Sequence, residues 1–360
     1  MSKKGFDGDA IVYCEGAYNT TNGKTAHGLV RYTERYNVVA VVDATFAGRD
    51  AGQVIDGIGN GIPIVASIKE AMSNAGANAY HPSHMVIGLA PDGGRLPKIA
   101  RQAVMEAIAL GLNIDCGLHD FLSDDPEIVS LAMNNKVSLR DIRKTPGRAD
   151  LHFFTGEIET VESLKIAVLG TDSAVGKRTT AWVLVQAIRN AGYKAELIGT
   201  GQTAWLQGAR YSMIMDSTIN DFVSGEIEYA MVKAWKEIRP DVMVIEGQGS
   251  LLNPAYPGGF EILAAGRPDI IILQHAPARK DYDGFPGYPI HPLRKQIDAI
   301  EMISDKPVVA ITVNHEDMTR EETAIACERI SRVHGLPAMD VLYQGEEELL
   351  WVVMPYIKQG

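Results

Sequence analysis

The most constraining feature of this sequence is the stretch IAVLGTDSAVGKRTTAWVLV at residues 166–185. An apolar run typical of a buried strand is followed by a glycine-flanked loop and then by a helical pattern. Consecutive backbone N–H groups in such a loop converge on an anion, and the N-terminus of the helix adds partial positive charge. We therefore expect a parallel α/β sheet with an anion-binding loop at the end of this strand.

The loop departs from the usual phosphate-loop pattern, G-x-x-x-x-G-K-[ST], at two positions. Gly170 lies one residue too early, and Arg178 stands where a Ser or Thr normally holds magnesium. Phosphate binding is still the prediction, because strand, loop, lysine and helix follow in the required order; a turn without a ligand is the alternative. The predicted cofactor-binding residues of this loop are Gly170, Thr171, Asp172, Ser173, Ala174, Val175, Gly176, Lys177, Arg178, Thr179 and Thr180.

Apolar segments and helical patterns alternate along the rest of the chain. This alternation predicts parallel sheets with right-handed crossovers, and hence an α/β fold. Helical periodicity is found at 23–34 and 95–111, and a last helix is expected at 346–357. The expected strands are 9–16, 37–43, 84–90 and 113–118 in the first part and 164–170, 195–201, 241–247, 269–275 and 307–314 in the second.

The alternation breaks at 144–163, where Pro146 and Gly147 mark a turn and a hairpin-like segment is expected to follow. The sequence therefore predicts two tandem α/β domains. Residues 1–146 would form a Rossmann-like domain with a parallel sheet, and residues 147–360 a P-loop NTPase-like domain with a second parallel sheet.

Composition narrows the class of partner. The net charge of −11, from 34 basic and 45 acidic residues, argues against a nucleic-acid partner. The three cysteines are far apart and form no CxxC pair, which disfavours a disulfide framework or a metal site and favours the cytoplasm. No segment resembles a signal peptide or a membrane span. We expect a cytoplasmic protein with a small-molecule substrate, without a membrane partner or bound metal, and homo-oligomeric as many α/β enzymes are.

Polar residues follow several strands of the second part, at the sheet edge where open α/β sheets bind ligands. Glu246 is a catalytic candidate, and Gln202 and Thr203 are candidates for binding the substrate. Asn314 would read the edge of a nucleobase, and His275 would act as a general base. The alternatives are a solvated acid for Glu246, a turn-forming residue for Asn314 and a histidine satisfied by backbone bonds for His275.

The first part carries a weaker signal. The glycines of EGAYNTTNGKTAHG only loosely match G-x-G-x-x-G, and Asp43 stands where an acid would bind ribose in a dinucleotide fold. Lys24 and His27 near the helix start are candidates for holding a phosphate or a substrate carboxylate. A domain that keeps this fold without a cofactor is the alternative.

Several motifs resemble one family along most of the chain. They are GKTAHGLVRYTERYNVVAVVDATFAGRDAG (23–52), GTDSAVGKRTT, GTGQTAWLQGA, DFVSGEIE and IEGQGSLLNPAY, and they are similar to the D-glutamate N-acetyltransferase family. That family was long a domain family of unknown function with a Rossmann-like N-terminal half and a P-loop C-terminal half. The P-loop half is also similar to dethiobiotin synthetase, through GTDSAVGK and the EG after a later strand.

The resemblance implies transfer of an acetyl group from acetyl-CoA to the amine of an acidic D-amino acid, with the phosphate loop holding coenzyme A. Acyl transfer needs a base for the amine, hence Glu246 or His275, and Arg178 and Arg210 would hold the carboxylates of the substrate. One alternative is an ATP- and magnesium-dependent ligase or kinase of the dethiobiotin-synthetase type. Another is a regulatory nucleotide-binding module without turnover.

Overall fold

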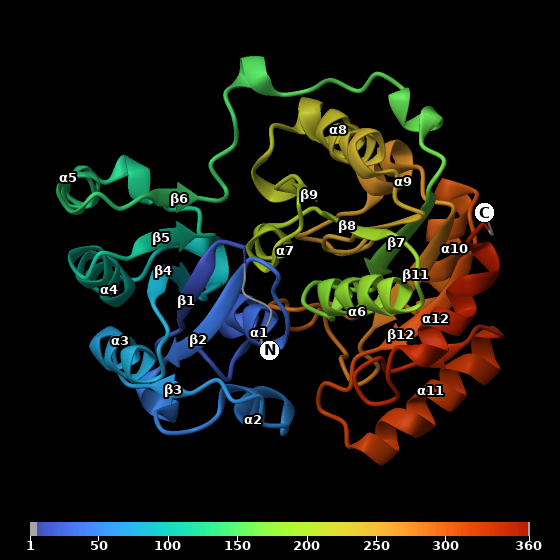
Figure 1. Cartoon of the computed structure of the whole chain (residues 1–360). Helices are drawn as coiled ribbons and strands as arrows, with labels where there is room; N and C mark the ends of the chain where they lie inside the picture. Colours follow the sequence, from blue (N-terminus) through green and yellow to red (C-terminus); the bar gives the residue numbers. More distant parts are fainter. Residues whose placement is uncertain (1–5, 359–360) are drawn as a thin grey trace. The chain divides into compact units, whose positions relative to one another are not determined.

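Two parallel β-sheets, one in each of two structural units, form the framework of the chain (Figure 1). The computed structural model describes residues 6–358. Unit 1 comprises the described residues up to Thr145 together with the short segment Trp205–Gly208. Unit 2 comprises Pro146–Ala204 and the described residues from Ala209 on. The expected α/β fold with two parallel sheets is confirmed.

The sheet of unit 1 has six parallel strands in the order β3-β2-β1-β4-β5-β6, which is the order of a Rossmann fold. The chain reverses its direction across the sheet between β1 and β4, where such folds open a crevice. The strands are β1 (Gly8–Tyr13), β2 (Tyr36–Val42), β3 (Ile64–Val65), β4 (Pro82–Ile87), β5 (Asn113–Cys116) and β6 (Leu139–Asp141).

Helices cover both faces of this sheet. The first two helices pack together on one face, and the other three form a row on the opposite face (Figure 1). Their caps follow from the sequence: for instance, Asp125 accepts N–H groups of the first turn of α5, and Pro126 supplies the N1 position. The helices are α1 (Lys24–Arg31), α2 (Ala51–Asp56), α3 (Ile68–Ala77), α4 (Lys98–Ala109) and α5 (Pro126–Asn135).

The segment Trp205–Gly208 belongs to unit 1, although it lies in the second half of the sequence. The Arg35 guanidinium lies 3.7 Å from the centroid of the Trp205 ring, and its Nε donates to the Trp205 carbonyl (2.8 Å). The Gln207 amide donates to the carbonyls of Gly28 and Tyr32 (2.8 Å each). The two domains predicted from the sequence, 1–146 and 147–360, do not include this assignment of a short segment from the second half of the chain to unit 1.

The sheet of unit 2 has seven parallel strands in the order β13-β12-β11-β7-β10-β8-β9. β7 lies in the middle, and all of its residues are buried because helices cover both faces of the sheet. The strands are β7 (Leu164–Gly170), β8 (Ala195–Gly199), β9 (Tyr211–Ser212), β10 (Val242–Glu246), β11 (Ile270–His275), β12 (Val308–Val313) and β13 (Ala338–Met339).

The helices of unit 2 include α6, which follows β7 directly and packs on β7, β8 and β10, and α12, which packs against α6. The consecutive helices α8, α9 and α10 contact one another in turn. The helices are α6 (Lys177–Asn190), α7 (Gln202–Gln207), α8 (Asn220–Ile238), α9 (Phe260–Gly266), α10 (Leu293–Ser304), α11 (Arg320–His334) and α12 (Glu347–Val353). The last three residues of α7 belong to unit 1.

The prediction of a hairpin-like segment after residue 146 is wrong. Residues 144–163 contain 3-10 turns at Arg148–Asp150 and Glu157–Thr160 and no strand. The buried Glu228 of α8 accepts the N–H groups of Thr155 (2.6 Å) and Ile158 (3.1 Å), so side chains replace the hydrogen bonds of a hairpin. At the other end, the expected helix 346–357 consists of α12 and a final 3-10 turn, Met354–Tyr356.

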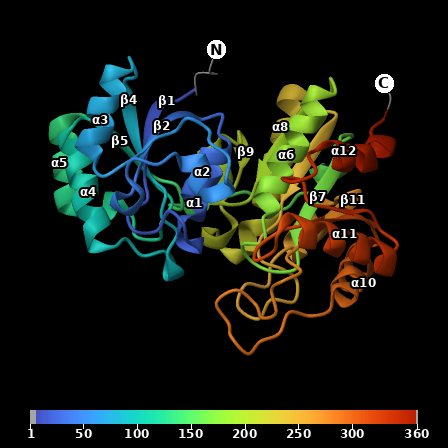
Figure 2. The ribbon, with the colours of Figure 1, turned by 90° about the horizontal axis from the view of Figure 1, so that it is seen from below.

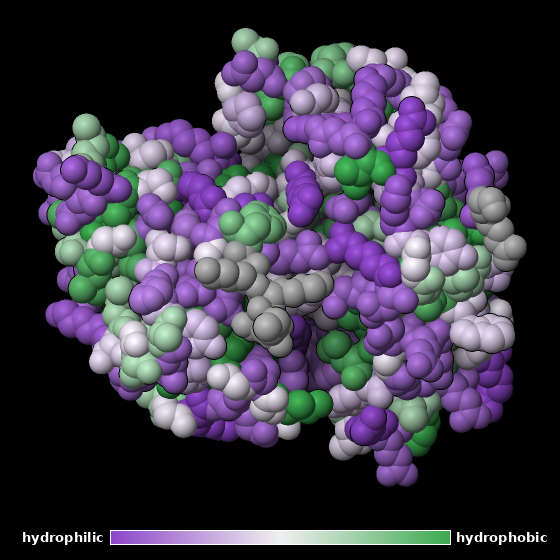
Figure 3. All heavy atoms as spheres, in the orientation of Figure 1, coloured by the Kyte–Doolittle hydropathy of each residue, from purple (hydrophilic) through white to green (hydrophobic). Residues whose placement is uncertain are grey.

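Hydrophilic side chains predominate over much of the face shown in Figure 3, and hydrophobic ones occur there in scattered groups. None of the helices between residues 6 and 358 has both the length and the apolar character of a membrane-spanning segment. Cys14, Cys116 and Cys327 are buried free thiols.

Candidate functional site

The loop between β7 and α6 joins the end of the central strand to the N-terminus of a long helix. β7 ends at Gly170 and α6 begins at Lys177, as the sequence predicts. Gly176 takes the N-cap position with φ of 106°, a left-handed conformation that a side chain would strain. Gly176 offers no side chain to cap the first turn of this 14-residue helix. The partial positive charge of the helix therefore points at the loop.

Lys177 lies over this loop. Its Nζ donates to the carbonyls of Asp172 (2.7 Å) and Gly249 (2.8 Å), and the residue is only 7% exposed. A Cβ on Gly170 would stand 2.8 Å from Cδ of Lys177, so the early glycine makes room for the lysine. The ammonium group is thus held at the loop instead of extending into solvent.

Arg178 and Glu246 lie side by side at the next strand end. Nη1 of Arg178 is 4.0 Å from Oε1 of Glu246, the last residue of β10. The other carboxylate oxygen accepts the Thr200 N–H (3.1 Å). Burial raises the pKa of Glu246, while Arg178, the Thr200 N–H and Lys177 act in the opposite direction. The site therefore contains a buried carboxyl whose affinity for a proton is increased.

His275 ends β11 beside the loop. Its Nδ1 is 2.9 Å from Thr171 Oγ1, so the ring and the hydroxyl share a hydrogen bond. Burial lowers the pKa of His275 to about 4, with help from the charges of His334 and Arg329. The imidazole is neutral at pH 7 and a weak base there. Its geometry suits positioning of Thr171.

Gln274, which was not a candidate from the sequence, makes hydrogen bonds that connect the phosphate loop to neighbouring elements. Its Oε1 accepts the hydroxyls of Thr180 (2.5 Å) and Thr312 (2.6 Å), and its carbonyl accepts the Thr171 N–H (2.9 Å). The Thr180 hydroxyl is therefore committed to the protein core. The sequence does not reveal this role, because a strand buried on both faces reads as a continuous apolar run and the partners of Gln274 come from other elements.

Asp172 is fully buried, and its carboxylate serves the protein itself. It accepts hydrogen bonds from the Ser173 N–H (2.7 Å), from Asn253 Nδ2 (2.8 Å), from Arg279 Nη1 (2.8 Å) and from the Asp283 N–H (2.8 Å). Burial works against the Arg279 charge, but hydrogen bonds to Asp172 and Glu316 raise its pKa overall. This network fixes the segment 276–292, which contains no helix or strand, to the phosphate loop (Figure 2, orange).

Asn314, the predicted reader of a nucleobase, lies next to the loop as expected. Its Nδ2 donates to the Val175 carbonyl (2.9 Å), and its Oδ1 accepts the Glu316 N–H (3.0 Å). The amide thus joins the loop after β12 to the phosphate loop, and the nucleobase contact stays a prediction.

The substrate-binding candidates of unit 2 differ in position. Gly201, the residue before Gln202, lies against Glu246, because a Cβ there would be 3.6 Å from the carboxylate. Thr203 is buried one residue further along α7. Arg210 is exposed between α7 and β9, where its charge acts on the neighbouring Tyr211.

Lys24 and His27 both belong to unit 1. Lys24 is the exposed first residue of α1, and the His27 ring lies against the Tyr18 carbonyl and the Tyr18 ring. Asp43 is fully buried and accepts the N–H groups of Tyr18 (3.1 Å) and Thr45 (2.9 Å). The acid expected at a ribose therefore caps local backbone.

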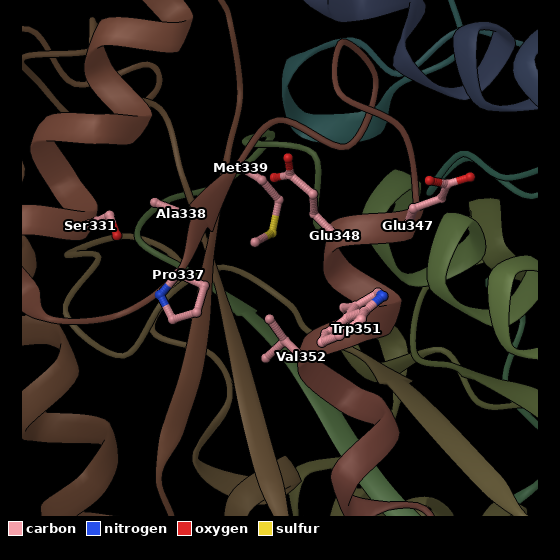
Figure 4. Close-up of a pocket in the computed structure, with 8 residues that line it drawn as sticks. All are labelled: Ser331, Pro337, Ala338, Met339, Glu347, Glu348, Trp351 and Val352. Carbon is pink, nitrogen blue, oxygen red and sulfur yellow. The ribbon is translucent and has the colours of Figure 1, made fainter.

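A cavity of about 410 Å³ elsewhere in unit 2 contains none of the predicted residues (Figure 4). It lies beside β13, the edge strand, and α11 and α12. Figure 4 shows its lining residues, which are Ser331, Pro337, Ala338, Met339, Glu347, Glu348, Trp351 and Val352. Among residues 6–358 no group of three His, Cys, Asp or Glu side chains is arranged to hold a metal.

The central β7, its loop and α6 define a P-loop α/β protein with an additional Rossmann-like unit. The chain belongs to the DUF1611 family: residues 152–350 match its P-loop domain (DUF1611_C), and residues 44–145 match its Rossmann-like domain (DUF1611_N), both described as domains of unknown function. The family resemblance noted in the sequence is confirmed.

Three similar proteins cover most of the chain. A protein from Pseudoalteromonas sp. named D-glutamate N-acetyltransferase is 34% identical over 74% of this chain and 79% of its own length. A protein of the same name from Tritonibacter scottomollicae is 28% identical over 83% of this chain and 88% of its own. A crystal structure of a DUF1611 family protein from Anabaena variabilis superposes with a TM-score of 0.87 at 29% identity, covering 96% of this chain and 99% of that one.

Proposed function

We propose that the protein is an acetyl-CoA-dependent N-acetyltransferase acting on the amine of an acidic amino acid such as D-glutamate. The observation that carries this proposal is the similarity over most of the chain to two proteins named D-glutamate N-acetyltransferase. The site supports it independently, because Lys177 and the start of α6 offer positive charge to a phosphate-bearing acetyl donor.

The residues at the strand ends suit acyl transfer. The donor supplies an acetyl thioester; the amine nitrogen forms a bond to its carbonyl carbon, and the carbon–sulfur bond breaks. An ammonium group must lose a proton first, and Glu246 is the proposed acceptor because burial raises the pKa of its carboxyl group. His275 is less suited to this role, since its pKa lies at about 4 and its Nδ1 is engaged with Thr171. Arg210, Gln202 and Thr203 remain proposed substrate contacts.

The test is an end-point assay with purified protein, acetyl-CoA and D-glutamate. Product is measured as N-acetylglutamate by mass spectrometry and as free thiol by a colorimetric reagent. The two yields are expected to be equal, and L-glutamate, D-aspartate and D-glutamine in parallel reactions define the preference for configuration and charge. No acetylated product from any acidic amino acid would refute the proposal.

The ligase or kinase alternative is tested in the same experiment. In parallel reactions ATP and magnesium replace acetyl-CoA, and release of phosphate or ADP is measured. Formation of a phosphorylated or ligated product only in these reactions would favour the alternative. Arg178 in the position of the magnesium-binding hydroxyl argues against that outcome.

A further inference from the structure

A P-loop fold implies magnesium, yet the residues at this site do not match its usual ligands. In magnesium-dependent phosphate loops, the hydroxyl after the lysine and a carboxylate at a neighbouring strand end share the ion. Here the first position is Arg178, and the carboxylate is Glu246. The guanidinium lies 4.0 Å from Oε1 of that carboxylate, so the position that usually supplies a magnesium-binding hydroxyl supplies a positive charge beside Glu246 instead.

The neighbouring groups reinforce this arrangement. The second oxygen of Glu246 accepts the Thr200 N–H (3.1 Å), and the residue is 3% exposed. A divalent cation at this carboxylate would meet the charge of Arg178 at close range. The hydroxyls further along α6 do not restore the ligand: Thr180 donates to Gln274 (2.5 Å), and Thr179 is turned by about 100° around the helix from position 178.

We propose that Arg178 replaces the divalent cation, so that the loop binds phosphate groups by protein charge alone, with Lys177 and Arg178 as the two cationic contacts. A guanidinium can donate two parallel hydrogen bonds to a phosphate, which an ammonium cannot. The ligand class is a diphosphate, as in ADP, coenzyme A or pyrophosphate itself. The proposal shares with the proposed function only the claim that the loop binds phosphate, and it is independent of acetyl transfer.

The experiment is calorimetric titration of coenzyme A, ADP and pyrophosphate, each in EDTA and in excess magnesium chloride. Wild-type protein is expected to bind at least one of them equally well, within about twofold, in the two buffers. Arg178→Thr should bind about tenfold or more weakly in EDTA and regain affinity in magnesium, because it restores a hydroxyl beside Glu246. Arg178→Lys should remain independent of magnesium, and Arg332→Thr, an exposed position on α11, is the matched control.

Wild-type binding that falls tenfold or more in EDTA would overturn the proposal, as would an Arg178→Thr variant that binds in EDTA like wild type. Absence of binding of all three probes would overturn it too. Magnesium-independent binding of ADP or pyrophosphate without coenzyme A would support this proposal and count against the acetyltransferase. If Arg178→Thr does not fold, judged by circular dichroism, the wild-type comparison and Arg178→Lys decide.

Discussion

The two units share the architecture of a parallel sheet with a crevice, but different side chains lie at the crevice in each unit. In each sheet the first strand, β1 or β7, lies where the chain reverses its direction across the sheet, and its loop leads into a helix. In unit 1 this loop is residues 14–23, and it contains the fully buried Tyr18. The Tyr18 N–H donates to Asp43, and its hydroxyl donates to the Ala51 carbonyl (2.9 Å). The loop of unit 1 is therefore closed by its own side chains.

In unit 2 the corresponding loop is shorter, spanning residues 171–176, and cationic groups gather at it. Lys177 lies over it, Arg178 flanks it, and the buried pair of Asp172 and Arg279 fixes its outer side. Strand order gives a crevice to each sheet, whereas the side chains differ: cationic groups gather at the loop of unit 2, and Tyr18 occupies the loop of unit 1. Substitutions in the two units should therefore have different effects.

Glu246→Gln should lower kcat by about 100- to 10 000-fold, because the amide cannot accept the proton of the substrate amine. Binding of acetyl-CoA, measured by titration, should stay within about threefold, since the phosphate loop is intact. Glu321→Gln on the exposed face of α11 is the control and should behave as wild type. A Glu246→Gln enzyme with unchanged kcat would exclude this carboxylate as the base.

Asp172→Asn should lower the free energy of unfolding of unit 2 by about 3 kcal/mol, because it leaves the buried Arg279 without its main counter-charge. Asp56→Asn removes a partly exposed pair with Arg31 in unit 1 and should cost less than about 1 kcal/mol. Hydrogen exchange with mass spectrometry reads peptides of each unit separately. Equal losses for the two variants would contradict the distinct role given to the buried pair.

Tyr18→Phe should destabilise unit 1 by about 1 kcal/mol, since it removes the hydrogen bond to Ala51. Faster exchange is expected in peptides covering 14–23 and 43–51, and affinity for acetyl-CoA should not change. A raised KM for D-glutamate in this variant would instead indicate that the crevice of unit 1 takes part in substrate binding, as predicted for Lys24 and His27.

Local signals in the sequence predicted the framework well. The strand 164–170 and the helix start at Lys177 follow from an apolar run and a glycine beside a lysine, which act over a few residues. The segment 144–163 was mispredicted because its order depends on Glu228, about 70 residues away in the sequence. In the sequence, Gly225 of α8 is an indication of this contact. A Cβ there would stand 2.1 Å from the His152 carbonyl, so α8 needs a glycine where the segment 144–163 crosses it.

The candidate site was predicted in part, for a similar reason. Residues at strand ends, such as Glu246, His275 and Asn314, meet at one sheet edge because topology requires it. The partners of Asp172, and the pairing of Thr180 with Gln274, depend on side-chain packing between distant segments, which no spacing rule encodes.

Phosphate binding by the loop after β7 is tested most directly by titration of acetyl-CoA into wild-type protein and Lys177→Ala, with Lys69→Ala, a change at an exposed lysine of unit 1, as the control. Saturable binding to the wild type and the control is expected, and binding to Lys177→Ala should be weakened by about 10- to 100-fold, because a charge-assisted contact to phosphate is lost. Equal affinity of Lys177→Ala and wild type would show that the loop after β7 is not the site of the phosphates.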